Sequence, residues 1–153
     1  MAMDDIDLRI IGLLTANART SYAELAQEVG LSAPSTAERV RRLEERGVVL
    51  GYEARVDPAA LGRDLTAFVS VSVGDRAQTR AFLAAVAKLP EVVECHHVAG
   101  DDDYLLKVHV DGTRGLEALV TDRLKAIKGV TRTRTTVVLS TTLDRPVTAV
   151  GGA

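Results

Sequence analysis

The chain has 153 residues, which is the size of one ordinary domain or of two small ones. With 46% hydrophobic and 26% charged residues, its composition is that of a globular protein and excludes a disordered or fibrous one. The formal net charge of −2 excludes a nonspecific polycation, so a nucleic-acid surface would have to be a local patch.

Three short helices are predicted in the first 47 residues. The first begins around Asp4 and has one apolar face. The second begins at Ser21, which can form a capping box with Glu24, and it ends at Gly30. The third runs from Ser32 to Arg46. Two short helices joined by a glycine-containing turn, the second of them rich in arginine, are typical of a helix-turn-helix domain.

The third helix has an apolar side and an arginine-bearing side. If Val40 points inward, Ala37 and Leu43 lie beside it and the basic side faces outward. A solvated helix face with ion pairs is the alternative for an arginine run, but the caps and the two preceding helices favour a DNA-binding surface. The candidate DNA-binding residues are Ser32, Ser35, Thr36, Glu38, Arg39, Arg41, Arg42 and Arg46.

Base recognition by this helix follows from the chemistry of the major groove. Arg39 or Arg42 can donate to guanine O6 and N7, and Glu38 can accept from cytosine N4. A dimer would hold two such helices roughly 34 to 36 Å apart, so we expect an imperfectly palindromic operator.

From residue 65 onward, the sequence predicts a βαββαβ order, the ferredoxin-like split-βαβ arrangement of an α+β fold. Residues 65–73 alternate between apolar and other residues, as a strand with one buried face does. The other predicted elements are a helix with Phe82, Leu83, Val86 and Leu89 that Pro90 closes, strands 92–98 and 104–110, a helix over 116–127 and a strand over 131–143.

Four parts of the chain are predicted from these patterns. They are a helix-turn-helix domain (1–50), a β linker (51–62), a ferredoxin-like domain for effector binding and oligomerisation (63–144) and a flexible tail (145–153).

The sequence carries no signal of an enzyme. Cys95, His96 and His97 are adjacent on a predicted strand, so their side chains alternate between opposite faces and cannot converge on one metal ion. No phosphate-binding loop or nucleophile with a paired base is recognisable, so we predict no catalytic residue, metal or cofactor. The 3% aromatic content also argues against an RNA-recognition domain.

The compartment follows from two further observations. No window contains the roughly 18 consecutive apolar residues of a membrane span, and the first residues do not resemble a signal peptide. A single cysteine fits a reducing compartment. We therefore expect a cytoplasmic protein without a membrane partner.

The segment Gly100–Asp103 is a second concentration of charge. Three adjacent carboxylates can attract a cation, and backbone N–H groups of a glycine turn can bind an anion, so a zwitterion would satisfy both. A plain polar hairpin and a divalent-ion site remain alternatives.

Six runs of residues in the two halves of the chain share a pattern with one known family. The runs are 4–7, 25–32, 38–49, 51–52, 94–107 and 132–138. Together they resemble the Lrp/AsnC (feast/famine) transcription regulators, and the similarity covers residues 3 to 143 in order.

This resemblance implies a DNA-binding regulator that dimerises through its sheet, often forms octamers, and binds a small effector, commonly an amino acid, near the glycine–aspartate hairpin. Members of the family commonly carry an aromatic residue where this chain has Asp102, which would change the size and charge of the pocket. The implied effector-binding residues are Gly100, Asp101, Asp102, Asp103, Tyr104, Thr133, Thr135 and Thr136.

Three other functions remain open on the sequence alone. They are an effector-independent regulator of the same fold, a DNA-free regulatory module that binds amino acids, and a small ferredoxin-like enzyme with an accessory helical domain.

Overall fold

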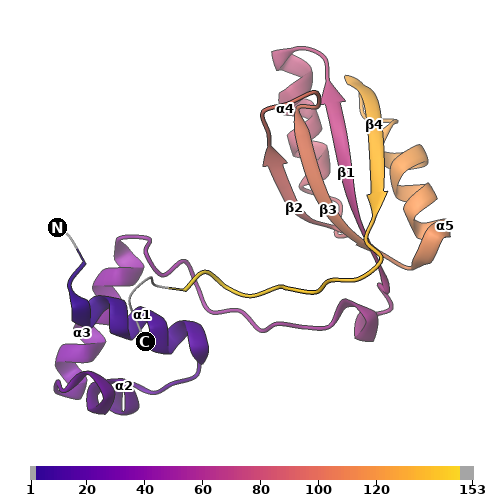
Figure 1. Ribbon diagram of the computed structural model, residues 1–153. Helices are drawn as coiled ribbons and strands as arrows, with labels where there is room; N and C mark the ends of the chain where they lie inside the picture. Colours follow the sequence, from indigo (N-terminus) through magenta and orange to yellow (C-terminus); the bar gives the residue numbers. More distant parts are fainter. Residues whose placement is uncertain (1–2, 149–153) are drawn as a thin grey trace. The chain divides into compact units, whose positions relative to one another are not determined.

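The computed structural model describes residues 3–148, which divide into two compact units (Figure 1). One unit contains the chain up to Arg55 together with the described residues 143–148, and the other is Val56–Thr142. Among the residues that the structure describes, no helix is long and apolar enough to cross a bilayer.

The N-terminal unit contains the three predicted helices, and each begins after a residue whose side chain caps it. Asp4 and Ser21 form capping boxes with Asp7 and Glu24, and Ser32 caps the third helix. The helices are α1 Asp5–Ala16, α2 Tyr22–Val29 and α3 Ala33–Glu45.

The turn between α2 and α3 depends on Gly30, whose φ of 70° lies in the left-handed region that favours glycine. The N–H of Leu31 then donates to the Ala26 carbonyl at 3.0 Å. The three helices bury one common apolar core, and the opposite side of α3 faces outward. The buried core residues are Ile10, Leu14, Leu25, Val40 and Leu43.

Part of the predicted flexible tail lies against this unit. Pro146–Thr148 line a cleft together with Leu8 and Ile11 of α1. Nearby, the Arg55 guanidinium pairs with the Asp144 carboxylate at 2.9 Å. Residues 149–153 of the predicted tail lie outside the described residues.

The predicted β linker forms no strand within the described part of the chain. Residues 51–57 have no regular secondary structure. They are followed by the 3-10 helix η1, Pro58–Leu61, which Asp57 caps. An extended segment becomes a strand only when a neighbouring segment pairs with it, and residues 3–148 supply no such partner for this segment.

The second unit is an antiparallel four-stranded sheet in the order β2-β3-β1-β4 (Figure 1). This order confirms the predicted ferredoxin-like topology. Its elements after η1 are β1 Leu65–Val73, α4 Arg76–Val86, β2 Val92–His97, β3 Tyr104–Val110, α5 Gly112–Glu117, the π-helical η2 Ala118–Leu124, and β4 Val130–Val137.

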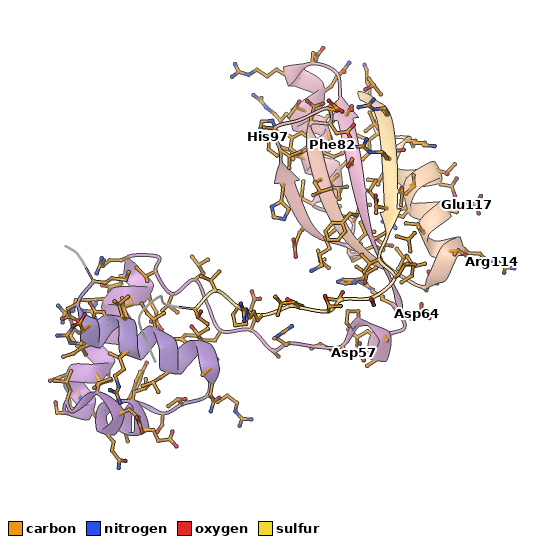
Figure 2. The ribbon with its side chains drawn as sticks, in the orientation of Figure 1. Asp57, Asp64, Phe82, His97, Arg114 and Glu117 are labelled. Atoms are coloured by element: carbon orange, nitrogen blue, oxygen red, sulfur yellow. The ribbon has the colours of Figure 1, made fainter. Side chains whose placement is uncertain are left out.

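One face of the sheet is buried beneath the helices. Alternate residues of β1 from Ala67 to Val73 and of β3 from Tyr104 to Val110 are buried, as the alternation predicts. Phe82 of α4 and Leu119 of η2 are buried in the same core, and Figure 2 shows the position of Phe82.

Some elements of the second unit end earlier than predicted. The last strand stops at Val137, which pairs with Ala67 of β1, because β1 itself begins only two residues before Ala67. Helix α4, which was predicted to be closed by Pro90, ends at Val86, four residues earlier. Propensity and periodicity locate an element more reliably than they locate its ends.

Candidate functional site

The outward side of α3 carries the arginines predicted to contact DNA. Ser35, Arg42 and Arg46 are exposed. The Arg42 side chain is 48% exposed, and its nearest carboxylate is Glu38 at 3.7 Å, which is too long for a hydrogen bond. Arg42 is therefore accessible to a ligand approaching this side of α3.

Arg41 differs from Arg42 because two carboxylates on the same helix hold it. Its guanidinium bonds to Glu38 at 2.7 Å and also pairs with Glu45. The Arg41 hydrogen bond holds the pKa of Glu38 below its usual value. Since Arg41 and Glu38 offset each other, Arg42, which lies 3.7 Å from Glu38, contributes more net positive charge to this surface than Arg41 does.

Arg39 lies in a different environment from the other arginines. Its Nη1 donates to Asp4 at 2.8 Å and to Asp7 at 2.8 Å, and only 23% of its side chain is exposed. It thus links α3 to the first turn of α1 instead of projecting outward as the helical wheel predicted. The sequence reasoning missed this link because the partners are 32 and 35 residues away.

Thr36 is buried. Its hydroxyl donates to the Ser32 carbonyl at 3.0 Å, one turn earlier in the helix, and none of its surface is exposed. Ser32 itself is exposed and accepts from the Ser35 N–H at 3.3 Å, so its hydroxyl caps α3. Of the predicted DNA-binding residues, Thr36 is therefore buried within the unit, and Arg39 links α3 to α1.

One basic residue that the sequence reasoning did not single out is Arg19. It is exposed just before the cap of α2, and its side chain has no partner among residues 3–148. In helix-turn-helix domains the first helix of the motif crosses the DNA backbone, so a basic residue at its start was the available signal.

Replacing Arg39 with methionine is expected to lower the melting temperature of the N-terminal unit at pH 7. A backbone hydrogen bond from Asp7, and after it the Arg39 side chain, lower the pKa of Asp4 below its ordinary value of 3.8. Stabilisation from a lowered carboxyl pKa is present above the unfolded pKa and is lost as the pH falls through the folded one. The difference between wild type and Arg39→Met should therefore shrink from pH 7 to about pH 3.

The exposed Arg9 of α1 is the matched control, because its one carboxylate contact, to Glu28, is 3.5 Å long. Circular dichroism melts of Arg9→Met should resemble those of wild type at both pH values. Equal melting temperatures for Arg39→Met and wild type at pH 7 would contradict the stabilising role of Arg39.

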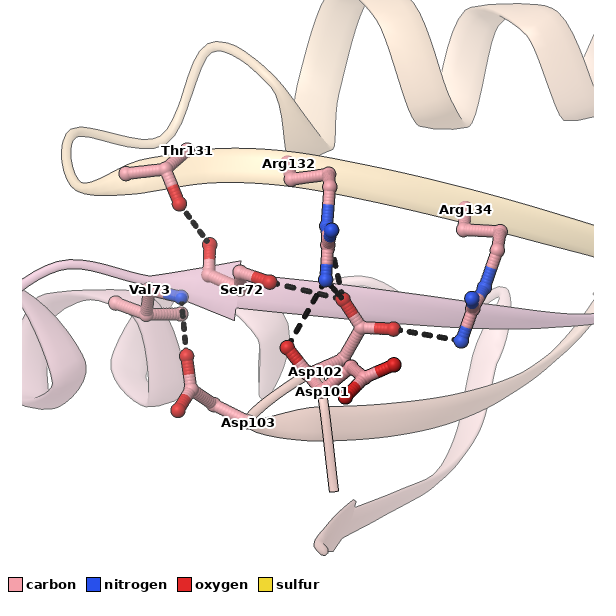
Figure 3. A network of polar contacts seen from close by, with 8 residues as sticks. All are labelled: Ser72, Val73, Asp101, Asp102, Asp103, Thr131, Arg132 and Arg134. Carbon is pink, nitrogen blue, oxygen red and sulfur yellow. Dashed lines mark hydrogen bonds and ion pairs between the residues drawn. The ribbon is translucent and has the colours of Figure 1, made fainter. Parts of the chain in front are cut away.

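The second candidate site is the hairpin that joins β2 to β3, where Asp102 is at the centre of a polar network (Figure 3). The side chain of Asp102 is only 5% exposed and accepts from the Ser72 hydroxyl at 2.8 Å. It also accepts from Arg132 at 2.8 Å and from Arg134 at 2.9 Å. The Ser72 bond first, and then the Arg132 bond, lower the pKa of Asp102.

Asp103 is also engaged within the fold. Its carboxylate accepts from the Val73 N–H at 2.7 Å (Figure 3). Its carbonyl accepts from the Val98 N–H at 2.9 Å. Asp101 is exposed, and its carboxylate bonds to no other residue within the described chain, although its carbonyl accepts from Arg132 at 2.9 Å. Of the three aspartates, only Asp101 has a carboxylate without a hydrogen bond within the described residues.

The remaining predicted effector residues are not all on one side of the sheet. Tyr104 is buried, with its ring 5.1 Å from the rings of Phe82 and His97. Thr135 and Thr136 are successive residues of β4, so they point to opposite faces. Gly100, in the hairpin, has a φ of 152°.

Ser72, Arg132 and Arg134 belong to the hairpin network but were not predicted. Arg132 and Arg134 alternate with threonines along β4, so both arginines point to the same face of the sheet. Two basic residues on one face, together with an acidic turn elsewhere in the sequence, were the available signal. The residues that the structure describes contain no cluster of His, Cys, Asp and Glu that could hold a metal ion.

Comparison with known families matches both halves of the chain. The model described as AsnC-type helix-turn-helix domain matches residues 3–44, and the model described as Lrp/AsnC ligand binding domain matches residues 66–148.

Similar curated proteins are transcription regulators and not enzymes. The chain is 43% identical over 140 residues to the HTH-type transcriptional regulator LrpA of Mycobacterium tuberculosis, covering 92% of each protein. It is 41% identical over 139 residues to the leucine-responsive regulatory protein of Escherichia coli, covering 90% of this chain and 85% of that protein.

Solved structures share the whole fold. A feast or famine regulatory protein from Mycobacterium tuberculosis, complexed with L-methionine, matches with a TM-score of 0.89 and 40% identity, over 97% of this chain and 99% of that one. A transcriptional regulator from Neisseria meningitidis, also in an L-methionine complex, matches with a TM-score of 0.89 and 30% identity, over 94% of each chain.

Proposed function

Since the chain belongs to the Lrp/AsnC family of transcriptional regulators, we propose that it regulates transcription by binding operator DNA through the outward side of α3. The observation that carries this proposal is the exposure of Arg42 on a helix whose other side is buried in the core. An exposed guanidinium can donate two hydrogen bonds to guanine O6 and N7.

The neighbouring residues support a division of roles. Ser35 and Glu38 lie on the exposed N-terminal part of α3, where a recognition helix contacts base edges. Glu38 can accept from cytosine N4, and Arg41, when it leaves Glu38, can bind a phosphate. Arg46 and Arg19 are further phosphate contacts, which position the helix without reading sequence.

We propose that the protein acts on DNA as a homodimer, or as a higher assembly of dimers. Two copies of α3 related by a two-fold axis would contact half-sites about one helical turn apart. The side of the sheet away from the helices carries half-buried residues, including Phe68 and Leu105, which suits contact with a second copy.

Selection of bound fragments from the host's own DNA tests this function. We expect enriched fragments to share an imperfect palindrome with half-sites roughly 10 base pairs apart. Enrichment of no sequence over a library without protein would reject DNA binding and favour a DNA-free regulatory module.

We also propose that an amino acid binds near the hairpin and modulates the assembly or DNA binding. Asp101 offers the free carboxylate for the ammonium group, whereas Asp103 is already bonded to Val73. Backbone N–H groups around Gly100 can bind the carboxylate of the ligand. The methionine complexes of the two similar structures support the ligand class, without giving the identity of the effector here.

A thermal-shift screen of the common amino acids is expected to identify at least one that raises the melting temperature. A ligand at about 100 times its Kd stabilises the folded state by about 2.7 kcal/mol, which is readily measured. The variant Asp101→Asn should reduce the shift, whereas Asp122→Asn, an exposed aspartate of η2, should not. No shift with any amino acid would favour an effector-independent regulator.

A further inference from the structure

A cleft of about 550 Å³ opens at one end of the sheet in the second unit. It lies where β1 begins and β3 ends, whereas the hairpin with Gly100 lies where β1 ends and β3 begins. The cleft is thus separate from the proposed effector site. Its volume is within the range of pockets that bind small molecules.

Three arginines line this cleft, and they are not equally engaged. Arg123 bonds to Glu91 at 2.5 Å, and Arg63 donates from Nη1 to the Pro90 carbonyl at 2.6 Å. Arg114 of α5 is exposed, labelled in Figure 2, and has no partner for its side chain within residues 3–148. The cleft therefore offers guanidinium donors to an anion.

Glu91 adds a hydrogen-bond acceptor to the cleft, beside the arginine donors. Its Oε1 accepts from Arg123, but its Oε2 is buried and has no hydrogen-bond partner in the described chain. A buried acceptor without a partner is costly, and native structures contain few of them. A ligand with an N–H or O–H group would satisfy this oxygen.

The remaining lining combines one further acidic residue, the exposed Asp111, with neutral and apolar residues. The Nδ1 of His109 lies 2.8 Å from the Thr66 hydroxyl, which leaves its Nε2 for another partner. Burial, and after it the charges of Lys107 and Arg63, lower the pKa of His109. Leu61, Val110 and Leu119 add apolar surface to the cleft.

We propose that this cleft binds a small carboxylic acid that carries a hydrogen-bond donor on the neighbouring carbon, that is, an α-hydroxy or α-amino acid with an apolar side chain. The carboxylate contacts Arg63 and Arg114, and the donor group contacts Glu91 Oε2. The apolar side chain lies against the leucines of the cleft. This site does not depend on DNA binding or on the hairpin site.

The proposal is tested by isothermal titration calorimetry with three probes that share one branched carbon skeleton and a carboxylate. The probes are L-valine, its α-hydroxy acid analogue and isovalerate, which lacks the donor group. We expect the amino acid, the hydroxy acid or both to bind at least about tenfold more tightly than isovalerate, because isovalerate leaves Glu91 unsatisfied. The comparison of the first two probes identifies which donor the site prefers.

The variants Arg114→Gln and Glu91→Gln should each weaken binding of the preferred probe by about tenfold or more. Arg114 is exposed and unpartnered in the described chain, so its replacement leaves the fold intact. Arg80→Gln, which changes an exposed arginine of α4 that does not line the cleft, is the matched control and should bind as wild type does.

Hydrogen–deuterium exchange on the full-length protein locates the ligand. Protection by the preferred probe should cover residues 109–119 and disappear in Arg114→Gln. Protection confined to residues 99–104, equal binding of isovalerate, or no binding of any probe would each overturn the proposal.

Discussion

An Arg42→Ala variant is expected to lose specific operator binding while keeping its melting temperature. Each bidentate arginine–guanine contact discriminates by about 5- to 150-fold, and a palindromic operator contains two of them. Arg42 is 48% exposed and has only a 3.7 Å approach to Glu38, so its removal leaves no buried group unpaired. The affinity is to be measured by fluorescence anisotropy at one fixed salt concentration, because phosphate contacts make binding salt-dependent.

Two variants of other arginines serve as controls for this measurement. Arg80→Ala removes an exposed arginine from α4, in the other unit, and should leave DNA affinity unchanged. Arg41→Ala should have a smaller effect than Arg42→Ala, because Glu38 and Glu45 already hold Arg41. An unchanged affinity for Arg42→Ala would refute the assignment of α3 as the recognition helix.

The second large effect is expected from Leu43→Ala. Leu43 is 1% exposed and belongs to the core that joins α3 to α1 and α2. Truncating a buried leucine costs about 2 to 5 kcal/mol, and so small a helical unit has only about that much stability to lose. The N-terminal unit should therefore unfold and release the operator, even though Leu43 is buried and touches no DNA.

The converse variant tests whether the two cores are independent. Leu119→Ala removes the same group from the core beneath the sheet, which shares no residue with the helical core. Hydrogen–deuterium exchange should show lost protection in α1 to α3 for Leu43→Ala and in β1 and β3 for Leu119→Ala. Loss of protection in both units for either variant would contradict their independence.

Local sequence signals were sufficient for most of the fold. The caps Ser21 and Ser32 and the left-handed Gly30 define helix ends through hydrogen bonds and backbone geometry within a few residues. The alternation in residues 65–73 predicts a strand because side chains of a strand alternate between faces. Such signals can be recognised in the sequence without knowing which segments contact one another in the fold.

The ends of strands and the roles of charged residues could not be predicted in this way. The last strand stops where β1 ceases to be its partner, which depends on sheet register. Asp102 is a buried anion and not a ligand-facing one, because Ser72, Arg132 and Arg134 are brought to it by strand pairing from 30 or more residues away.

The sequence by itself determined the helix-turn-helix order and the βαββαβ order. Only the tertiary structure decided that Arg39 bonds to α1 while Arg42 stays exposed, and that Asp101 is the free carboxylate of the hairpin. The physical reason is that caps and periodicity act within a few residues, whereas the partner of a charge is set by which distant elements pack together.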